Sequence, residues 1–273
     1  MKKNNSVLLS TPYILWMVVF TLIPLGVVGY YALTDPATGE FTFSNIRSLS
    51  QYWGVLWDSI AYSLVSALIC LVMGYPVAYY IAHCRATTQK ILYMLVMLPM
   101  CMSFLLRTLA WVGLLQDTGI LNDFLEIIGV GRMQLIRTPG AVILGMVYNY
   151  LPYMILPLYS VICKIDNRLV EAAEDLGCNG RKVFSKVILP LSMPGILTGM
   201  TMVFVPAVST FYISNKMGST ETILIGDIIE RMFKQGDNAN MGAALSLLLM
   251  VLVFVCTGII NRFGGDEEGS VIV

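Results

Sequence analysis

Residues 169–195, LVEAAEDLGCNGRKVFSKVILPLSMPG, form a charged stretch in a chain that is otherwise largely apolar. Asp166 or Asn167 can cap a first helix, and Gly177 suits the left-handed residue that ends one. Asn179 can cap a second helix, which is expected to stop before Pro190. The stretch therefore predicts two short helices joined at a glycine, between long apolar segments.

Those apolar segments predict an all-α integral membrane protein. Of the 273 residues, 57% are hydrophobic and only 12% are charged, and the mean hydropathy is +0.75. About 20 helical residues cross the hydrocarbon core of a bilayer. Six runs satisfy this length, at 13–33, 60–82, 91–116, 140–163, 191–212 and 242–260. The first is too long for a signal-peptide core and has no small-residue cleavage site after it, so we expect it to be retained as a span.

The distribution of Lys and Arg sets the expected orientation. With the N-terminus inside, the inner loops hold ten cations, Lys2, Lys3, Arg85, Lys90, Lys164, Arg168, Arg181, Lys182, Lys186 and Arg262. The outer loops hold six, Arg47, Arg132, Arg137, Lys216, Arg231 and Lys234. We therefore expect a cytoplasmic tip at 1–12, a six-span domain at 13–262 with a cytoplasmic loop at about 164–190, and a cytoplasmic acidic tail at 263–273.

The spans lack the groups that would drive transport or catalysis. The chain has no GxxxxGK[ST] motif, no CxxC and a single histidine, so we expect no cofactor, no metal site and no enzyme activity. The spans contain no Asp or Glu, although ion-coupled transporters usually keep ionisable groups at membrane depth. The energy for transport must then come from another protein.

Arg107 is the single charge within the predicted spans. Such a cation costs at least about 2.5–3.5 kcal/mol at the bilayer centre unless it finds a partner. We favour a structural role, in which Arg107 pairs with a carboxylate of an outer loop or of a partner chain, over direct contact with a solute.

The charged stretch offers a surface for such a protein. Glu171, Glu174 and Asp175 share one side of the first predicted helix, where like charges repel each other. Leu169, Val170, Ala173 and Leu176 form the apolar side of that helix, and Val183, Phe184, Val187 and Ile188 that of the second. The acidic side is readily explained by a cationic partner surface. The alternative is a solvated loop whose cations only enforce topology.

The stretch resembles the EAA loop of ABC-importer permeases, which has E-A-A, a glycine four residues after the second alanine, and L-P near its end. The matching residues are Glu171, Ala172, Ala173, Gly177, Val187, Leu189 and Pro190, with Glu174, Asp175 and Arg181 on the same loop. The resemblance implies the type I ABC importer permease fold, with this loop docked on a cytoplasmic ATPase. It also implies a homologous second permease, two ATPase copies and an extracytoplasmic solute-binding protein, in a bacterial inner membrane and without a nucleic-acid partner.

Residues 98–130, 138–166 and 189–229 resemble the first permease subunit of spermidine/putrescine importers, and the likeness extends over about 10–260. It implies a polyamine as the solute. Two alternatives remain open, a permease of the same fold for ferric iron, phosphate or sulfate, and an ion-coupled secondary transporter.

A cationic solute requires aromatic faces or carboxylates along its route. Pro99, Pro152, Pro157 and Pro206 are expected to interrupt spans three to five, and broken helices usually line a cavity. An amphipathic helix near 221–234 is expected at the outer surface, with acids at the entrance. The candidates for the route are Tyr148, Asn149, Tyr150, Tyr153, Phe211, Tyr212, Asp227 and Glu230. Gly195 and Gly199 permit close helix packing, either against the partner permease or within this subunit.

Overall fold

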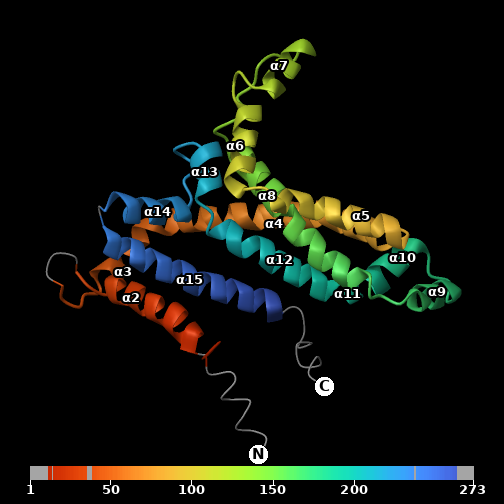
Figure 1. The fold of residues 1–273 in the computed structure, drawn as a ribbon, viewed down its shortest axis with the longest axis horizontal. Coiled ribbons are helices and arrows are strands. Elements are labelled where there is room, and N and C mark those ends of the chain that lie inside the picture. The colour runs from red at the N-terminus through yellow and green to blue at the C-terminus, as the bar shows by residue number, and fades with distance from the viewer. Residues whose placement is uncertain (1–11, 14, 36–38, 237, 263–273) are drawn as a thin grey trace, which may run out of the picture. The chain divides into compact units, whose positions relative to one another are not determined.

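The computed structural model describes residues 12–13, 15–35, 39–236 and 238–262. The regular structure of these residues is helical, apart from an isolated antiparallel bridge between Thr34 and Phe41 (Figure 1). The expected tip at 1–12 and tail at 263–273 lie almost wholly outside the described residues. The chain divides into two compact units, 1–54 with 228–252, and 55–227 with 253–273.

The larger unit contains most of α4, the start of α14 and the helices between them. In chain order these are α4 (Trp53–Ala82), α5 (Ala86–Met97), η3 (Leu98–Cys101), α6 (Phe104–Leu115), α7 (Ile120–Ile127), α8 (Pro139–Ile162), α9 (Asn167–Asp175), α10 (Gly180–Val183), η4 (Phe184–Ile188), α11 (Leu189–Leu191), α12 (Met193–Val208), α13 (Tyr212–Met217) and α14 (Ile225–Gln235). Thr138 caps α8 by accepting a hydrogen bond from the amide of Ala141 at 3.1 Å, and Pro139 takes the first helical position.

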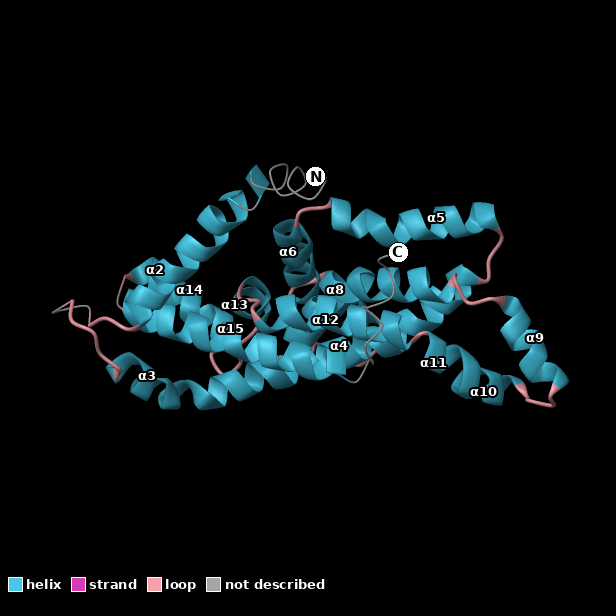
Figure 2. Ribbon diagram, turned by 90° about the horizontal axis from the view of Figure 1, so that it is seen from below, coloured by secondary structure: helices cyan, strands magenta, loops and turns pink. Residues whose placement is uncertain are grey.

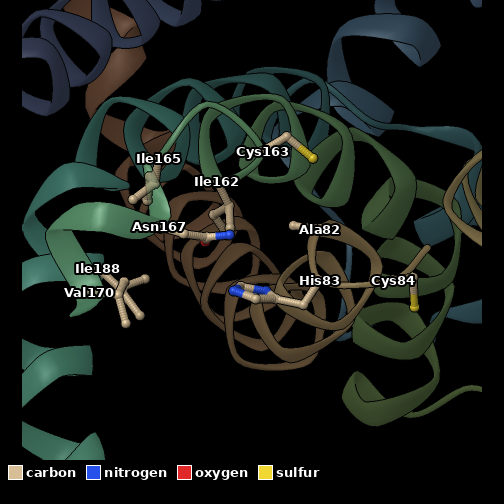
Figure 3. Close-up of a pocket in the computed structure, with 9 residues that line it drawn as sticks. All are labelled: Ala82, His83, Cys84, Ile162, Cys163, Ile165, Asn167, Val170 and Ile188. Carbon is tan, nitrogen blue, oxygen red and sulfur yellow. The ribbon is translucent and has the colours of Figure 1, made fainter. Parts of the chain in front are cut away.

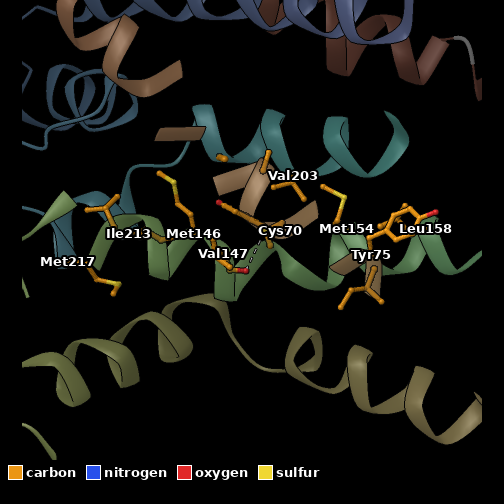
Figure 4. Close-up of a cluster of buried hydrophobic side chains, with 14 of the residues drawn as sticks. Cys70, Tyr75, Met146, Val147, Met154, Leu158, Val203, Ile213 and Met217 are labelled. Atoms are coloured by element: carbon orange, nitrogen blue, oxygen red, sulfur yellow. Dashed lines mark hydrogen bonds between the residues drawn. The ribbon is translucent and has the colours of Figure 1, made fainter. Parts of the chain in front are cut away.

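The core of this unit lies where α4, α8 and α12 run side by side (Figure 4). Fully buried side chains from all three helices meet there, among them Cys70, Met146, Met154 and Val203. The thiol of Cys70 donates to the Val147 carbonyl oxygen across the α4–α8 contact, with 3.7 Å between the two atoms.

Two glycines allow α12 to approach α8 closely. A Cβ at Gly195 would lie 3.1 Å from the carbonyl oxygen of Pro157, and one at Gly199 would lie 2.6 Å from the sulfur of Met154. Of the two arrangements expected for this glycine pair, the structure shows packing within the subunit.

The smaller unit contains η1 (Val18–Leu22), α2 (Ile23–Ala32), α3 (Ser44–Ser48), η2 (Leu49–Tyr52), most of α14 and the first part of α15 (Ala239–Arg262). Ala32 of α2 is buried with Ala243 and Ala244 of α15. The amide of Asn240 donates to the carbonyl oxygen of Thr34 at 2.6 Å, which fixes the end of α2 to α15.

Four of the predicted spans are single helices long and apolar enough to cross a membrane, Leu15–Ala32, Ser44–Ala82, Pro139–Ile162 and Ala239–Ile260. The other two are bent pairs. The segments Ala86–Cys101 and Phe104–Ile127 meet at 87°, and Gly180–Leu191 and Met193–Val208 meet at 62°. Counting each pair as one span gives the six that were predicted. The third predicted span, 91–116, is interrupted beside Pro99, as expected, so α6 runs in a different direction from α5 (Figures 1 and 2).

The interruption expected at the prolines of the fourth span is not found. Helix α8 runs unbroken through Pro152 and Pro157, and α12 ends two residues after Pro206. Pro99 lies in the 3-10 turn η3 that precedes the 87° bend. Pro99 lies at the start of this 3-10 turn, where the α-helical hydrogen-bond spacing has already ended, and it supplies no amide donor to resume that spacing. The break in the third span therefore falls beside Pro99.

Candidate functional site

The charged stretch folds into the predicted first helix, α9. Asp166 caps it by accepting a hydrogen bond from the amide of Arg168 at 3.0 Å. The helix lies with α10 at one end of α4 and α8 in both views (Figures 1 and 2).

Gly177 ends this helix as predicted. Its φ is +78°, and the amides of Gly177 and Cys178 donate to the carbonyl oxygens of Glu174 and Ala173 at 2.8 and 3.0 Å. These two bonds form a Schellman motif, which requires a residue that tolerates the left-handed region. Asn179 then caps α10 by accepting from the amide of Lys182 at 3.1 Å. Local cap chemistry therefore sets both the turn and the start of the second helix.

The second helix does not stop before Pro190, contrary to the prediction. It continues from α10 through the π-helical segment η4 and through α11, and the chain bends at Ser192. The wider π turn directly precedes Pro190, which has no amide to donate and would crowd the preceding turn of a regular α-helix. The helix accommodates the proline by a change of hydrogen-bond spacing.

The side chains of this loop are divided between an exposed tip and a buried base. Leu176 is 85% exposed at the turn, and the three carboxylates beside it are exposed. Val183 and Ile188 are buried against the rest of the unit. The remaining residues matched by the EAA-like pattern are exposed, at Ala172, Gly177, Arg181 and Pro190, or half-buried, at Ala173, Val187 and Leu189.

Phe184 connects the loop to the spans. Its ring packs edge-on against Tyr75 and Tyr79 of α4, with centroids 5.5 and 6.4 Å apart. The hydroxyl oxygen of Tyr75 lies 2.8 Å from that of Ser192, at the bend before α12. Phe184 therefore joins the loop to α4, and Tyr75 joins α4 to the start of α12.

A pocket of about 260 Å³ lies between the loop and the ends of α4 and α8 (Figure 3). Val170 and Asn167 line it from α9, and Ile188 lines it from η4. His83, whose Nδ1 is 2.8 Å from the Tyr79 carbonyl oxygen, faces Asn167 in Figure 3. The loop base is thus incompletely packed.

Three of the predicted route residues belong to one aromatic cluster. Tyr150 packs against Tyr153 of α8 and against Phe104 of α6, with centroid distances of 6.4 and 6.5 Å. Phe104 lies 6.2 Å from Tyr212 of α13. The ammonium of Lys216 lies 6.0 Å from the Tyr212 ring centroid, so this ring already faces a cation.

The other route candidates lie apart from this cluster. Tyr148 packs against Trp111 of α6 at 5.3 Å. Asn149 is buried and donates to the carbonyl oxygen of Gly145 at 2.9 Å. Phe211 is exposed and makes none of the ring contacts found among the described residues.

The amphipathic helix near 221–234 is present as α14, but Asp227 is not exposed on it. The side chain of Asp227 is 4% exposed and accepts a hydrogen bond from the amide of Leu224 at 3.0 Å, while Ser59 of α4 accepts one from Ile225 at 2.8 Å. Asp227 therefore closes the start of its own helix. Glu230 pairs with Lys234 one turn further along, at 2.6 Å.

Arg107 is buried at 6% exposure in α6. Among the residues that the structure describes, its Nε and Nη1 have no hydrogen-bond partner. The expected pairing with a carboxylate of an outer loop of this chain is absent from the described part.

Sequence reasoning missed Phe104 and Trp111, which supply α6's aromatic contacts to α8. Both were assigned to an ordinary span, and their spacing of seven residues on one helical face was the available signal. No cluster of three or more metal-binding side chains occurs in the described ranges.

Comparison with known families gives one match over most of the chain. The model of the family described as "Binding-protein-dependent transport system inner membrane component" matches residues 74–264.

Individual relatives agree with that match. The chain is 38% identical over 247 residues to the spermidine/putrescine transport system permease protein PotB of Haemophilus influenzae, covering 87% of this chain and 86% of the relative. Identity to PotB of Escherichia coli K12 is also 38%, covering 90% of that protein. The inner membrane ABC transporter permease protein YdcU of Escherichia coli is 27% identical over 88% of this chain and 82% of its own length.

Solved structures share the fold at low sequence identity. A chain of a bacterial ABC transporter involved in the import of the acidic polysaccharide alginate superposes with a TM-score of 0.80 and 19% identity, covering 96% of both chains. A chain of the MetNI methionine ABC transporter superposes with a TM-score of 0.58 and 19% identity, covering 77% of this chain and 93% of that one. The helical arrangement is thus that of ABC importer permeases.

Proposed function

Because this chain belongs to the family of binding-protein-dependent transport system inner membrane components, we propose that it is a permease subunit of an ATP-driven importer of polyamines such as spermidine and putrescine. Family membership makes it a multi-pass inner-membrane protein and a transport component.

The observation that carries the solute class is the 38% identity, over 87% of this chain, to permeases named for spermidine and putrescine transport. The aromatic cluster of Tyr150, Tyr153 and Phe104 is chemically compatible, because ring faces attract ammonium groups. The likeness to the alginate transporter, at 19% identity, supports the fold alone.

The helical hairpin of α9 and α10 is the proposed contact with a cytoplasmic ATPase. Its exposed tip combines Leu176 with the carboxylates of Glu171, Glu174 and Asp175, which fits a groove that has both apolar and cationic surface. Phe184 links the hairpin to α4. ATP-driven movement of the partner would reach the spans by this route and alternate the access of the solute site.

The remaining partners follow from the same assignment. A homologous second permease forms the other half of the pathway, two ATPase copies bind inside, and a solute-binding protein delivers the polyamine from outside. We propose that both termini and the α9–α10 hairpin lie in the cytoplasm. The excess of Lys and Arg in the predicted inner loops supports this orientation. This chain itself hydrolyses no ATP in the proposed complex.

ATP hydrolysis by the purified complex tests the solute. The chain is co-expressed with a second permease, an ATPase and a solute-binding protein of the same organism, and the complex is placed in proteoliposomes. We expect spermidine or putrescine, together with the binding protein, to raise the rate of ATP hydrolysis. Stimulation by phosphate, sulfate or ferric iron alone would reject the polyamine and favour another permease of this fold.

The same vesicles separate ATP-driven from ion-coupled transport. Uptake should stop when ATP is withheld and should not return when a proton gradient is imposed. Uptake driven by the gradient without ATP would support the secondary transporter.

A further inference from the structure

The pocket at the base of the α9–α10 hairpin has no role in the proposed solute route. It has a volume of about 260 Å³ and lies between the ends of α4 and α8 on one side and α9 and η4 on the other (Figure 3). The apolar spans formed by α4 and α8 end at Ala82 and Ile162, which both line the pocket. The pocket therefore lies where two spans leave the membrane, at the level of the lipid headgroups.

The walls of this pocket are largely apolar and carry a few polar groups. The aliphatic side chains are those of Ala82, Ile162, Ile165, Val170 and Ile188. His83 and Asn167 face each other in Figure 3. The Nδ1 of His83 lies 2.8 Å from the carbonyl oxygen of Tyr79, which can only accept, so Nδ1 carries a proton and Nε2 is left for a ligand. This combination suits a molecule with an apolar part and a polar end.

Two exposed cations adjoin the pocket at the ends of the spans. Arg85 follows the lining residue Cys84 after α4, and Lys164 follows the lining residue Cys163 after α8. Neither cation forms an ion pair among the residues that the structure describes. Unpaired cations from two separate segments favour a ligand whose polar end is negative.

Two acids of the α9 segment lie near the pocket but do not line it. Asp166 caps the helix by accepting a hydrogen bond from the amide of Arg168 at 3.0 Å. Glu171 is exposed on the acidic side of the helix. Arg168, which follows the lining residue Asn167, adds a third cation. In the described part of the chain, no Asp or Glu lines the pocket, so the lining itself does not repel an anion.

We propose that this pocket binds the phosphate of an anionic ligand, with the headgroup of an inner-leaflet phospholipid as the favoured source. His83, Arg85 and Lys164 would contact the phosphate, whose oxygens accept charge-assisted hydrogen bonds. The aliphatic wall would cover the glycerol and the first acyl carbons, which a free phosphate lacks. The bound headgroup would connect the hairpin to the ends of α4 and α8, and transport would then depend on anionic lipid.

Photocrosslinking with a diazirine-labelled phosphatidylglycerol tests the site in the complete transporter, held in phosphatidylcholine nanodiscs. We expect an adduct on segments 82–85 or 162–170, and one at least about threefold weaker with labelled phosphatidylcholine. Arg85→Gln with Lys164→Gln should lower the phosphatidylglycerol adduct by at least about fivefold, because both cations attract the anionic headgroup. The matched control, Arg181→Gln with Lys182→Gln, removes the same charge from exposed residues of α10, outside the pocket, and should stay within about twofold of wild type.

A second pair of variants changes the volume of the pocket and keeps every charge. Ala82→Met places a larger side chain among the lining residues and should also lower the adduct by at least about threefold. Ala86→Met, at the exposed start of α5, should leave the adduct unchanged. Added inorganic phosphate distinguishes the two sources of the ligand. Loss of the adduct would show that a free phosphate can occupy the pocket, whereas an unchanged adduct would assign the pocket to the lipid headgroup.

Three outcomes would overturn the inference. They are equal adducts with the two lipids, adducts only outside segments 82–85 and 162–170, and an equal loss of adduct in the pocket variant and in the α10 control. The inference uses the proposed orientation to name the inner leaflet, and it does not depend on the solute. Nanodiscs expose both faces of the bilayer, so a chain of inverted orientation would still form the adduct. Failure of the proposed function and failure of the lipid site are therefore distinguishable.

Discussion

The left-handed backbone at Gly177 makes this position sensitive to any side chain. A Cβ there costs about 1–2 kcal/mol, although nothing in the described chain lies within 4 Å of it. We therefore expect Gly177→Asp to insert normally but to distort the turn between α9 and α10, and to abolish polyamine uptake. Glu171→Lys, which reverses a charge on the same hairpin, should also abolish uptake.

Gly180→Asp is the matched control, because Gly180 has equally open surroundings but no left-handed φ. At the first position of α10, an aspartate is compatible with the positive end of the helix dipole. The measurements are the amount of ATPase that co-purifies with each variant and the uptake of labelled spermidine. Normal ATPase binding and uptake by Gly177→Asp and Glu171→Lys would show that the hairpin does not couple the two proteins.

Local chemistry made the caps of this hairpin predictable. Asp166, Gly177 and Asn179 act within three residues of their own positions, so the sequence contains all the information needed. Asp227 shows the opposite case. The helical period places it on a polar face, but the contact of Ser59 with the start of α14 decides that this part of the face is buried.

At the scale of elements, the contact between α8 and α12 depends on Gly199. We expect Gly199→Leu to lower the stability of the purified chain by about 1–3 kcal/mol, because an added side chain collides with Met154. Thermal unfolding in detergent measures the loss. Gly258→Leu in α15 is the control, since no atom lies within 4 Å of a Cβ there. Equal midpoints for the two variants would contradict the tight packing of α12 on α8.

We expect the π-helical segment η4 to transmit movements of the ATPase to α4 through Phe184. In Phe184→Ala the hairpin remains but its ring contacts with Tyr75 and Tyr79 are lost. Aromatic pairs contribute about 0.5–1.5 kcal/mol each, so we expect polyamine transported per ATP hydrolysed to fall by about two- to tenfold. Phe254→Ala, which removes an exposed ring of α15, should leave this ratio unchanged. A normal ratio in Phe184→Ala would place the transmission elsewhere in the hairpin.

Spans are predictable from hydropathy because composition and length suffice. Three of the four single helices lie close to their predicted limits, whereas the one predicted at 60–82 begins at Ser44. The bend between Cys101 and Phe104 was not predictable in this way, since an apolar residue scores equally in a straight or a broken helix. Proline position indicated the break beside Pro99 but not the course of α8, which contains Pro152 and Pro157 without a break. Packing on both sides of α8 preserves the helix where the local preference opposes it.

At the scale of the whole molecule, the distribution of Lys and Arg predicts how the chain is oriented in the membrane. If both termini are cytoplasmic, Asp123 in α7 faces outward and Ser185 in η4 faces inward. In a cysteine-free background, Asp123→Cys should react with an impermeant maleimide in intact cells, whereas Ser185→Cys should react after the membrane is opened. The reverse pattern would invert the orientation and remove the hairpin from the ATPase.

The solute route also belongs to the whole molecule, because the second permease supplies half of it. Within this chain, Tyr153 is the most accessible member of the aromatic cluster on α8, at 37% exposure, whereas Tyr150 lies beneath it beside Arg107. A cationic solute is expected to approach the outer ring and to avoid the guanidinium. Tyr148, at 36% exposure, offers a second ring on the same helix.

Removing one such ring should weaken the attraction for an ammonium by about 0.5–2 kcal/mol. We therefore expect Tyr153→Ala to raise the apparent KM for spermidine by about two- to thirtyfold at normal assembly, and Tyr148→Ala to do so less, because its ring already packs on Trp111. Tyr80→Ala, which removes an exposed ring of α4, is the control. Asp227→Asn should reduce stability and leave the apparent KM unchanged, since that carboxylate holds the start of α14. If both tyrosine variants match the control in KM and maximal rate, the route runs along the second permease, and the aromatic cluster serves to pack α6 on α8.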